Sequence, residues 1–320
     1  MIRIFIVAVA LLAFFETGYA QTLDYPNRPI RIVVPFPPGT AAEIAARFFG
    51  QKMTEILGQP VIIDLKGGAN GFIGVQAVLS APPDGYTLFL GGRSTLVTNV
   101  ALFKKLPYDP LTDFAPISML LRSPVILLTS KSSDYQRLDQ FIASAKRADG
   151  KITIGSGAAG YLLTAELFAN RANFKYTNVP YKSAPDSIIG VASNQIDMAV
   201  VDITSALPMI RSGRVNALAI ATEQRASGAP DIPTTEQAGV KDFLSAPWNG
   251  VMVATKVPND IVNKLSDLFI RIIAMQDTKD FFTAQQVELM PAGQEAMRTF
   301  QKQDIQKWKQ IVIEAKVEQL

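Results

Sequence analysis

The side chains available for chemistry in this sequence are few in kind. The 320 residues include neither histidine nor cysteine, so the chain lacks the commonest general base, the usual thiolate nucleophile and the preferred ligands of zinc, copper and iron. Catalysis would have to rest on carboxylates, lysine or tyrosine. The sequence also contains no Gly-x-Ser-x-Gly elbow and no Walker phosphate loop. We therefore predict that the protein is not an enzyme and that it holds no metal and no cofactor.

The glycine-rich segment 67–71 and the overall charge argue against nucleotides and nucleic acids as ligands. The segment reads Gly-Gly-Ala-Asn-Gly and lies between a predicted strand and a predicted helix. Its spacing does not match the dinucleotide fingerprint. The net charge is +3, which is too small to indicate nucleic-acid binding.

Two charged residues lie where predicted strands end, which makes them candidates for ligand contacts. Arg93, in the segment GGRST at residues 91–95, could hold a carboxylate through two parallel N–H groups. The alternative is an arginine solvated in a loop. Asp202 could accept from an amine, a hydroxyl or a bridging water of a ligand, or it could cap a helix at Ser205.

Thr40 and Glu43 have the Thr-x-x-Glu spacing of a helix capping box. In that interpretation each side chain satisfies a backbone amide of the helix that follows, contributing about 1 kcal/mol. The functional alternative is that Thr40 offers its hydroxyl to a ligand, or that Glu43 meets an amino group. We favour capping, because it explains both residues together.

The elements that must position these residues alternate between strands and helices. Near the N-terminus, strands at 30–34, 61–64 and 86–90 alternate with helical patterns, which predicts a parallel sheet covered by helices. A second series begins near Val125. Its predicted strands are 125–129, 152–154, 196–201 and 217–221, and its predicted helices are 138–148, 161–170, 185–194 and 205–212.

We predict an α/β protein with two lobes and a ligand cleft between them. After Trp248 come one strand, 250–254, and three helical stretches with no further strand, which return to cover the first lobe. Lobe 1 would comprise residues 21–122 and 248–320, lobe 2 residues 123–247, with a hinge at the two crossings. In such sheets ligands lie where strands end and helices begin, which favours an anion.

The first twenty residues have the layout of a secretory signal peptide. Arg3 precedes an apolar run from Ile4 to Phe15, and Ala20 follows small residues. A membrane anchor is the alternative, but spanning a bilayer takes roughly 20 apolar residues. We expect cleavage after Ala20 and a periplasmic location. Without cysteine the mature chain has no lipid-attachment site, so it should diffuse freely.

Several sequence blocks resemble the Bug-type receptors of tripartite tricarboxylate transporters. They extend over nearly the whole mature chain, in the order found in that family. The blocks are YPNRPI at 25–30, VPFPPG at 34–39, LGQPV at 57–61, GANG at 68–71 with IG at 73–74, PDGYTL at 83–88, LPYDP at 106–110 with DF at 113–114, VPYK at 179–182, SALP at 205–208 and PT at 233–234.

The resemblance implies a type II periplasmic binding fold that closes over a carboxylate-bearing solute. It also implies separate membrane subunits as partners. In such receptors the loop after the first strand holds the carboxylate through backbone groups and ordered water. That role would pass here to Phe36, Pro37, Pro38, Gly39, Thr40 and Ala41.

This sequence departs from the family in the second lobe. Where relatives often have hydroxyl residues and a histidine, it reads SGAAGYL at residues 156–162, which predicts a less polar wall. Tyr161 could stack on a flat ligand or pack as an ordinary helix residue. The remaining candidate ligand contacts are Arg93, Ser94 and Thr95 from the first lobe, and Ser156, Ala159, Tyr161 and Asp202 from the second.

The leading hypothesis is a monomeric periplasmic receptor for an organic acid, aromatic acids included. The alternative hypothesis is a periplasmic sensor partner that uses the same closed form to contact a signalling receptor.

Overall fold

A computed structural model describes residues 25–226 and 229–320. The predicted signal peptide, residues 1–20, lies outside the described residues. Within the described part of the chain, no helix is long and apolar enough to span a membrane.

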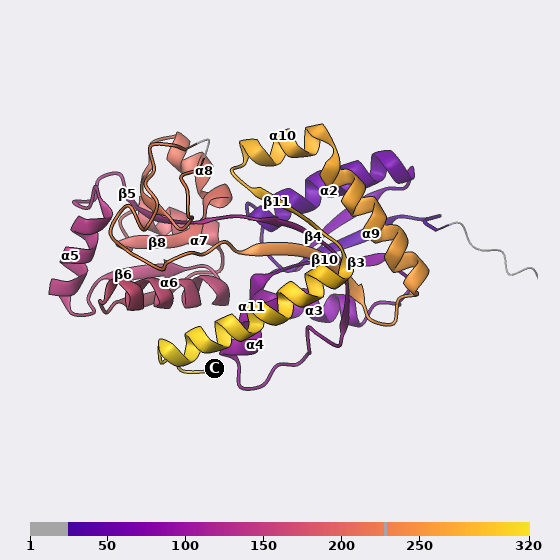
Figure 1. Ribbon diagram of the computed structural model, residues 1–320, viewed down its shortest axis with the longest axis horizontal. Helices are drawn as coiled ribbons and strands as arrows, with labels where there is room; N and C mark the ends of the chain where they lie inside the picture. The colour runs from indigo at the N-terminus through magenta and orange to yellow at the C-terminus, as the bar shows by residue number, and fades with distance from the viewer. Residues whose placement is uncertain (1–24, 227–228) are drawn as a thin grey trace, which may run out of the picture.

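The chain builds two separate β-sheets, one in each lobe (Figure 1). The first has the strand order β11-β4-β10-β3-β1-β2 and the second has the order β7-β6-β8-β5-β9. The first comprises β1 (Ile30–Val34), β2 (Val61–Leu65), β3 (Thr87–Gly92), β4 (Phe114–Arg122), β10 (Trp248–Ala254) and β11 (Glu288–Ala292). The second comprises β5 (Val125–Ser130), β6 (Thr153–Ser156), β7 (Thr177–Pro180), β8 (Met198–Asp202) and β9 (Val215–Ile220).

Helices cover both faces of the first sheet because its strands present apolar side chains on both faces. Ile30, Ile32 and Val34 of β1 pack into one core with helix α2, and Val33 packs into the other. The helices of this lobe are α2 (Ala41–Leu57), α3 (Phe72–Leu79), α4 (Asn99–Leu102), α9 (Asn259–Ala274), α10 (Gln276–Ala284) and α11 (Gln294–Glu314), with the short turns η1 (Ala69–Gly71) and η2 (Ser94–Thr98).

The second sheet is covered in the same way by four helices. These are α5 (Leu138–Ala148), α6 (Ala159–Ala172), α7 (Ala184–Ala192) and α8 (Ile203–Arg211). Phe141 of α5 and Phe168 of α6 lie in the core that also contains Trp308 of α11, so this core continues from one lobe into the other. Figure 1 shows α6 beside α4 and α11, at the junction of the two lobes.

The prediction of a parallel sheet is confirmed for the three N-terminal strands on which it was made. β1 is parallel to β2 and β3, and β6 is parallel to β7 and β8. However, β10 runs antiparallel to both β3 and β4, and β5 runs antiparallel to β8 and β9. These antiparallel strands flank the two crossings between the lobes, where the chain leaves one sheet and later returns in the opposite direction.

The prediction that no strand follows residue 254 is wrong. β11 lies between α10 and α11 and pairs antiparallel with β4, with Leu289 opposite Leu121. It forms the edge of the first sheet and contains Pro291, a residue tolerated at a sheet edge because its missing N–H leaves no buried partner unsatisfied. The last helices do return to the first lobe, as predicted, but they bring this strand with them.

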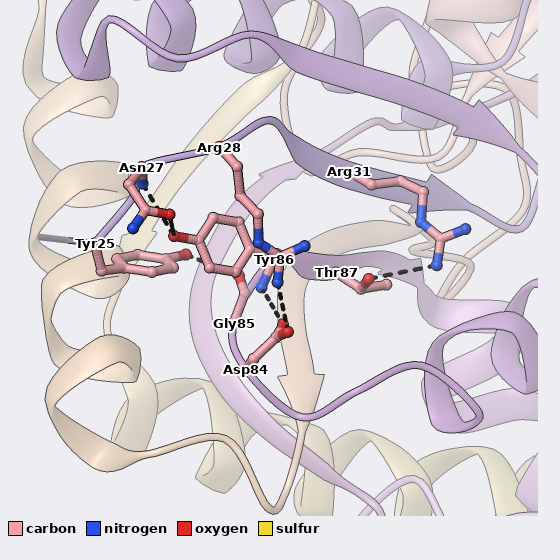
Figure 2. Close-up of polar contacts among 8 residues, drawn as sticks. All are labelled: Tyr25, Asn27, Arg28, Arg31, Asp84, Gly85, Tyr86 and Thr87. Atoms are coloured by element: carbon pink, nitrogen blue, oxygen red, sulfur yellow. Dashed lines mark hydrogen bonds and ion pairs between the residues drawn. The ribbon is translucent and has the colours of Figure 1, made fainter. Parts of the chain in front are cut away.

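The first described residues are fixed to a turn near residue 85 (Figure 2). Tyr25 donates to the carbonyl oxygen of Gly85 at 2.7 Å, and Arg28 pairs with Asp84 at 2.6 Å while its guanidinium lies over the ring of Tyr86. The hydroxyl of Tyr86 donates to Asn27 at 2.9 Å. The sequence blocks at 25–30 and 83–88 therefore contact each other, which gives both a structural role remote from the cleft.

A candidate ligand cleft between the two lobes

A cavity of about 650 Å³ lies between the two lobes. Its walls come from loops of the first lobe, from helix starts of the second lobe and from both crossing segments. The lining residues are Pro35–Pro38, Thr40–Ala42, Leu65, Gly67–Gly71, Gly92–Ser94, Ser123, Gly157, Ala158, Gly160, Tyr161, Tyr181–Ala184, Asp202 and Pro247–Asn249.

Three helices present their N-terminal turns to this cavity. Thr40 and Ala41 begin α2, Ala158 and Gly160 begin α6, and Ser183 begins α7. The first amides of a helix have no carbonyl partner within that helix, and the helix dipole adds positive potential at the same end. Three such ends around one cavity favour a ligand with negative charge.

The structure brings nine of the thirteen predicted site residues to the cavity wall. They come from four separate segments of the chain, so the cavity collects them from both lobes. The nine are Phe36, Pro37, Pro38, Thr40, Ala41, Arg93, Ser94, Tyr161 and Asp202.

The other four lie beside the cavity without lining it. Thr95 is buried and its hydroxyl closes a turn onto Gly92. Ser156 donates to the Asn178 side chain at 2.7 Å within the second sheet, and Ala159 is buried in the core. Gly39 adopts a φ of +80° at the tip of its loop and faces Pro185 of α7.

Thr40 caps α2, in agreement with the interpretation we favoured. Its hydroxyl oxygen accepts from the amide of Glu43 at 3.4 Å and donates to the carbonyl of Pro37 at 3.1 Å. Glu43 accepts from the amide of Gly39, one residue earlier than in a standard capping box, and pairs with Arg47. The carboxylate of Glu43 is therefore engaged by Arg47 of its own helix and by the loop that precedes the helix.

Arg93 is neither solvated nor free. Its side chain is 4% exposed, and it donates to Ser245 at 3.1 Å and to Thr164 at 2.9 Å. Its guanidinium also lies 4.4 Å from the ring centroid of Trp308. Burial lowers the pKa of Arg93 to about 10, with the charge of Asp304 acting in the opposite direction.

Asp202 is 2% exposed and caps α8. One carboxylate oxygen accepts from the amide of Ser205 at 2.9 Å, and the other accepts from the hydroxyls of Ser205 at 2.9 Å and Tyr161 at 2.6 Å. Burial, followed by the charge of Asp202, raises the pKa of Tyr161 well above its usual value. The tyrosine is therefore neutral and its hydroxyl is directed at Asp202.

Sequence reasoning missed several lining residues. Lys182 and Ser183 at the start of α7, and Trp248 and Asn249 at the start of β10, all contribute to the wall. Lys182 belongs to the VPYK block, so its position in a strand-to-helix connection could have indicated it. No local signal indicated that Trp248 lines the cavity, because this depends on how the two segments that cross between the lobes, near residues 122 and 247, lie relative to each other.

Phe72, the first residue of α3, does not line the cavity. Its ring packs against Phe103 and Tyr108, with centroids 5.2 Å and 5.9 Å away. It belongs to the core of the first lobe.

Comparison with known proteins gives consistent matches over most of the chain. The model of the family described as "Tripartite tricarboxylate transporter family receptor" matches residues 45–317. Protein BugT of Bordetella pertussis is 32% identical over 91% of this chain and 90% of its own length.

Two solved structures from Rhodopseudomonas palustris superpose well. The protein Rpa4515, solved with adipate, is 26% identical with a TM-score of 0.90 and covers 93% of this chain and 100% of its own. MatC, solved with bound malate, is 28% identical with a TM-score of 0.83 and covers 90% of this chain and 100% of its own. The chain described here belongs to the tripartite tricarboxylate transporter receptor family.

Proposed function

We propose that this protein captures a small organic acid in the cavity between its lobes and presents it to the membrane components of a tripartite transporter. Members of the family are periplasmic solute-binding receptors and not enzymes, and they bind small carboxylates. The observation that carries the proposal for this chain is electrostatic. Three helix N-termini and two basic side chains, Arg93 and Lys182, border a cavity whose one carboxylate among the described lining residues is Asp202.

The state of Asp202 supports an acid over an amine as the ligand. Its oxygens already accept three hydrogen bonds from Ser205 and Tyr161. A ligand ammonium group would have to compete with these donors in a buried position. A ligand carboxylate instead meets first-turn amides of α2 and α6, such as those of Ala41 and Gly160, which line the cavity.

We assign the carboxylate contact to the loop that begins α2. The cavity-lining backbone there runs through Phe36, Pro37, Pro38, Thr40 and Ala41, with Gly39 providing the turn. Ser94 and Tyr161 would contact the rest of the ligand from the two lobes. Thr95, Ser156 and Ala159 would support the lining residues that are next to them in the chain, which are Ser94, Gly157, Ala158 and Gly160.

The body of the ligand should be partly apolar. Phe36, Leu65, Tyr161, Tyr181 and Trp248 contribute rings or aliphatic surface to the lining. The structural relatives named above carry adipate and malate. We therefore include dicarboxylates and aromatic acids in the ligand class.

We further propose that residues 1–20 are a cleaved signal peptide and that residues 21–320 act as a monomer in the periplasm. Lobe 1 would comprise residues 21–122 and 248–320, and lobe 2 residues 123–247. The crossings near residues 122 and 247 would serve as the hinge. The apolar run from Ile4 to Phe15 and the order of the two sheets support this division.

A thermal-shift screen of residues 21–320 tests the proposal. The panel contains adipate, malate, citrate, benzoate, nicotinate and aspartate, with adipamide as an uncharged counterpart of adipate. An acid present at about a hundred times its dissociation constant stabilises the fold by roughly 2.7 kcal/mol and should raise the midpoint by several degrees. Adipamide should produce no shift. Equal shifts with adipamide and adipate, or no shift with any acid, would contradict a carboxylate receptor.

A further inference from the structure

Arg93 links the first lobe to the start of α6 through hydrogen bonds. It follows β3 in the first lobe, yet one guanidinium nitrogen, Nη2, donates to Gly160 O at 3.4 Å and to Thr164 Oγ1 at 2.9 Å. The other terminal nitrogen, Nη1, donates to Ser245 Oγ at 3.1 Å, in the crossing that leads back to β10. These contacts join segments 67 to 152 residues apart in sequence.

This arrangement leaves Arg93 poorly placed to grip a ligand itself. A bidentate arginine–carboxylate pair uses two parallel N–H groups, and both such edges of the guanidinium include Nη2. The hydrogens of Nη2 are directed at Gly160 and Thr164. The remaining nitrogen, Nε, is buried without a partner and lies against Gly160.

The start of α6 depends on contacts of this kind because it has no side-chain cap. Its N-cap residue is Ala158, which offers no oxygen from its side chain. The first amides of α6 are therefore open to the cavity. The direction in which they point depends on the contacts that hold this turn against the first lobe, including those of Arg93.

We propose that Arg93 acts as a positioning residue for ligand binding, by holding the first turn of α6 so that its free amides point at the ligand carboxylate. The inference rests on the proposed function and adds to it a residue that affects ligand binding indirectly, through the position of α6. Burial disfavours the charge of Arg93 and lowers its pKa, and the contact with the Trp308 ring offsets part of the cost of burying that charge.

Thr164 allows the proposal to be tested away from the ligand. It is fully buried and does not line the cavity. Thr164→Val removes the hydroxyl that accepts from Arg93 and nearly preserves the shape. Thr164→Ser keeps the hydroxyl and is the matched control. Arg93→Lys keeps the positive charge but loses the planar fork.

We would titrate adipate, malate and benzoate calorimetrically into the wild type, these three variants and the double variant Arg93→Lys/Thr164→Val. Loss of one or more hydrogen bonds should weaken the acid that binds tightest by about fivefold in Thr164→Val and by about tenfold in Arg93→Lys. The double variant should be no weaker than Arg93→Lys alone, because both changes remove the same contact. Thr164→Ser should stay within about twofold of the wild type.

Two results would overturn the positioning role. Unchanged affinity in Thr164→Val, with a large loss in Arg93→Lys, would mean that Arg93 contacts the ligand directly. Losses that multiply in the double variant would mean that the two residues act separately. The melting midpoint of each variant without ligand shows whether it folds, and Thr164→Val decides the question if Arg93→Lys does not. A wild type that binds none of the three acids overturns the proposed function itself.

Discussion

Lys182 is the residue whose charge is most available to a ligand. It lines the cavity at the start of α7, is exposed, and forms no ion pair within the described part of the chain. It lies at the start of α7, which meets the α2 loop through Pro185, so it is placed to meet a second carboxylate. Arg93, the other basic residue of the wall, is engaged in contacts between the lobes.

Lys182→Gln should therefore weaken adipate more than benzoate. We expect about a threefold loss for adipate, the scale of a solvent-exposed ion pair, and a smaller loss for the monocarboxylate. Isothermal titration at low and high salt measures both, since salt should shrink the difference. Lys151→Gln, on the surface outside the cavity, is the control. Equal losses for the two acids would remove Lys182 from the site.

Glu166, in the middle of α6, gives a pH dependence of stability. Burial raises the pKa of this carboxyl, while the hydrogen bond from Tyr176 at 2.8 Å lowers it. A raised folded pKa means that the charged form destabilises the fold at neutral pH. The destabilisation disappears as pH falls through the folded value to the unfolded one.

Glu166→Gln should accordingly raise the melting midpoint at pH 7 by roughly 1–2 °C, a small effect because solvent reaches part of this carboxylate. The amide oxygen of glutamine can still accept from Tyr176. Below about pH 4 the variant and the wild type should melt together, since the glutamate is then protonated in both states. A constant difference from pH 4 to pH 8 would show that charge is not its cause.

Among single residues, those whose partners are near in sequence could be predicted and those with distant partners could not. Thr40 caps its own helix three residues before Glu43, and the spacing alone indicated it. Asp202 likewise caps a helix through Ser205. The partners of Arg93 lie far along the chain, in the other lobe and in the crossing. No local pattern could therefore show that its guanidinium already donates to protein groups.

At the level of elements, the starts of α6 and α7 are in direct backbone contact at Gly157. A Cβ at this position would lie 2.2 Å from the carbonyl carbon of Ser183 and 2.3 Å from the nitrogen of Ala184. Both segments line the cavity. Only glycine lets these two helix starts approach so closely.

Gly157→Ala should push the two helix starts apart. We expect the free energy of unfolding to fall by about 1–3 kcal/mol, as for other overpacked sites. Affinity for the ligand should fall as well, because two sets of N-terminal amides move. Gly293→Ala is the matched control, since its Cβ would meet only ordinary contacts at 3.7 Å and beyond. Chemical denaturation and titration of both variants measure the effects, and unchanged affinity in Gly157→Ala would contradict the role of this contact.

The sequence predicted most helices and buried strands, because their periodicity is local. α5 and β1 have the bounds that the pattern predicted, 138–148 and 30–34. The antiparallel direction of β10 could not be predicted, since it depends on where the chain returns from the other lobe. β11 was missed because it is short, holds a proline and is only partly buried, so it carries none of the usual signals of a strand.

For the whole molecule, the ligand must enter and leave between two lobes that touch where the α2 loop meets the start of α7. An ideal Cβ on Gly39 of the α2 loop would lie 3.9 Å from the Cβ of Pro185 in α7. Disulfides span about 3.5–4.5 Å between their Cβ atoms. Because the chain contains no cysteine, a pair introduced here would have no competing thiol.

Gly39→Cys/Pro185→Cys, oxidised in the presence of a bound acid, should trap it. Release should be slowed at least roughly tenfold and restored by a reductant, because affinity differences between related states lie mostly in dissociation rates. Cysteine at Gly39 is strained by its positive φ, but the oxidised and reduced forms share that strain. Dissociation measured by dilution in both forms decides the matter. Equal rates would show that the ligand leaves by another route.

The junction of the lobes also gives the protein an optical signal. Its only two tryptophans are Trp248 and Trp308. The first lines the cavity and donates to Asp304 at 2.8 Å, and the second lies against the guanidinium of Arg93. All tryptophan emission thus originates where the lobes meet. Intrinsic fluorescence should therefore report both the filling of the cavity and the relative movement of the lobes, without any attached dye.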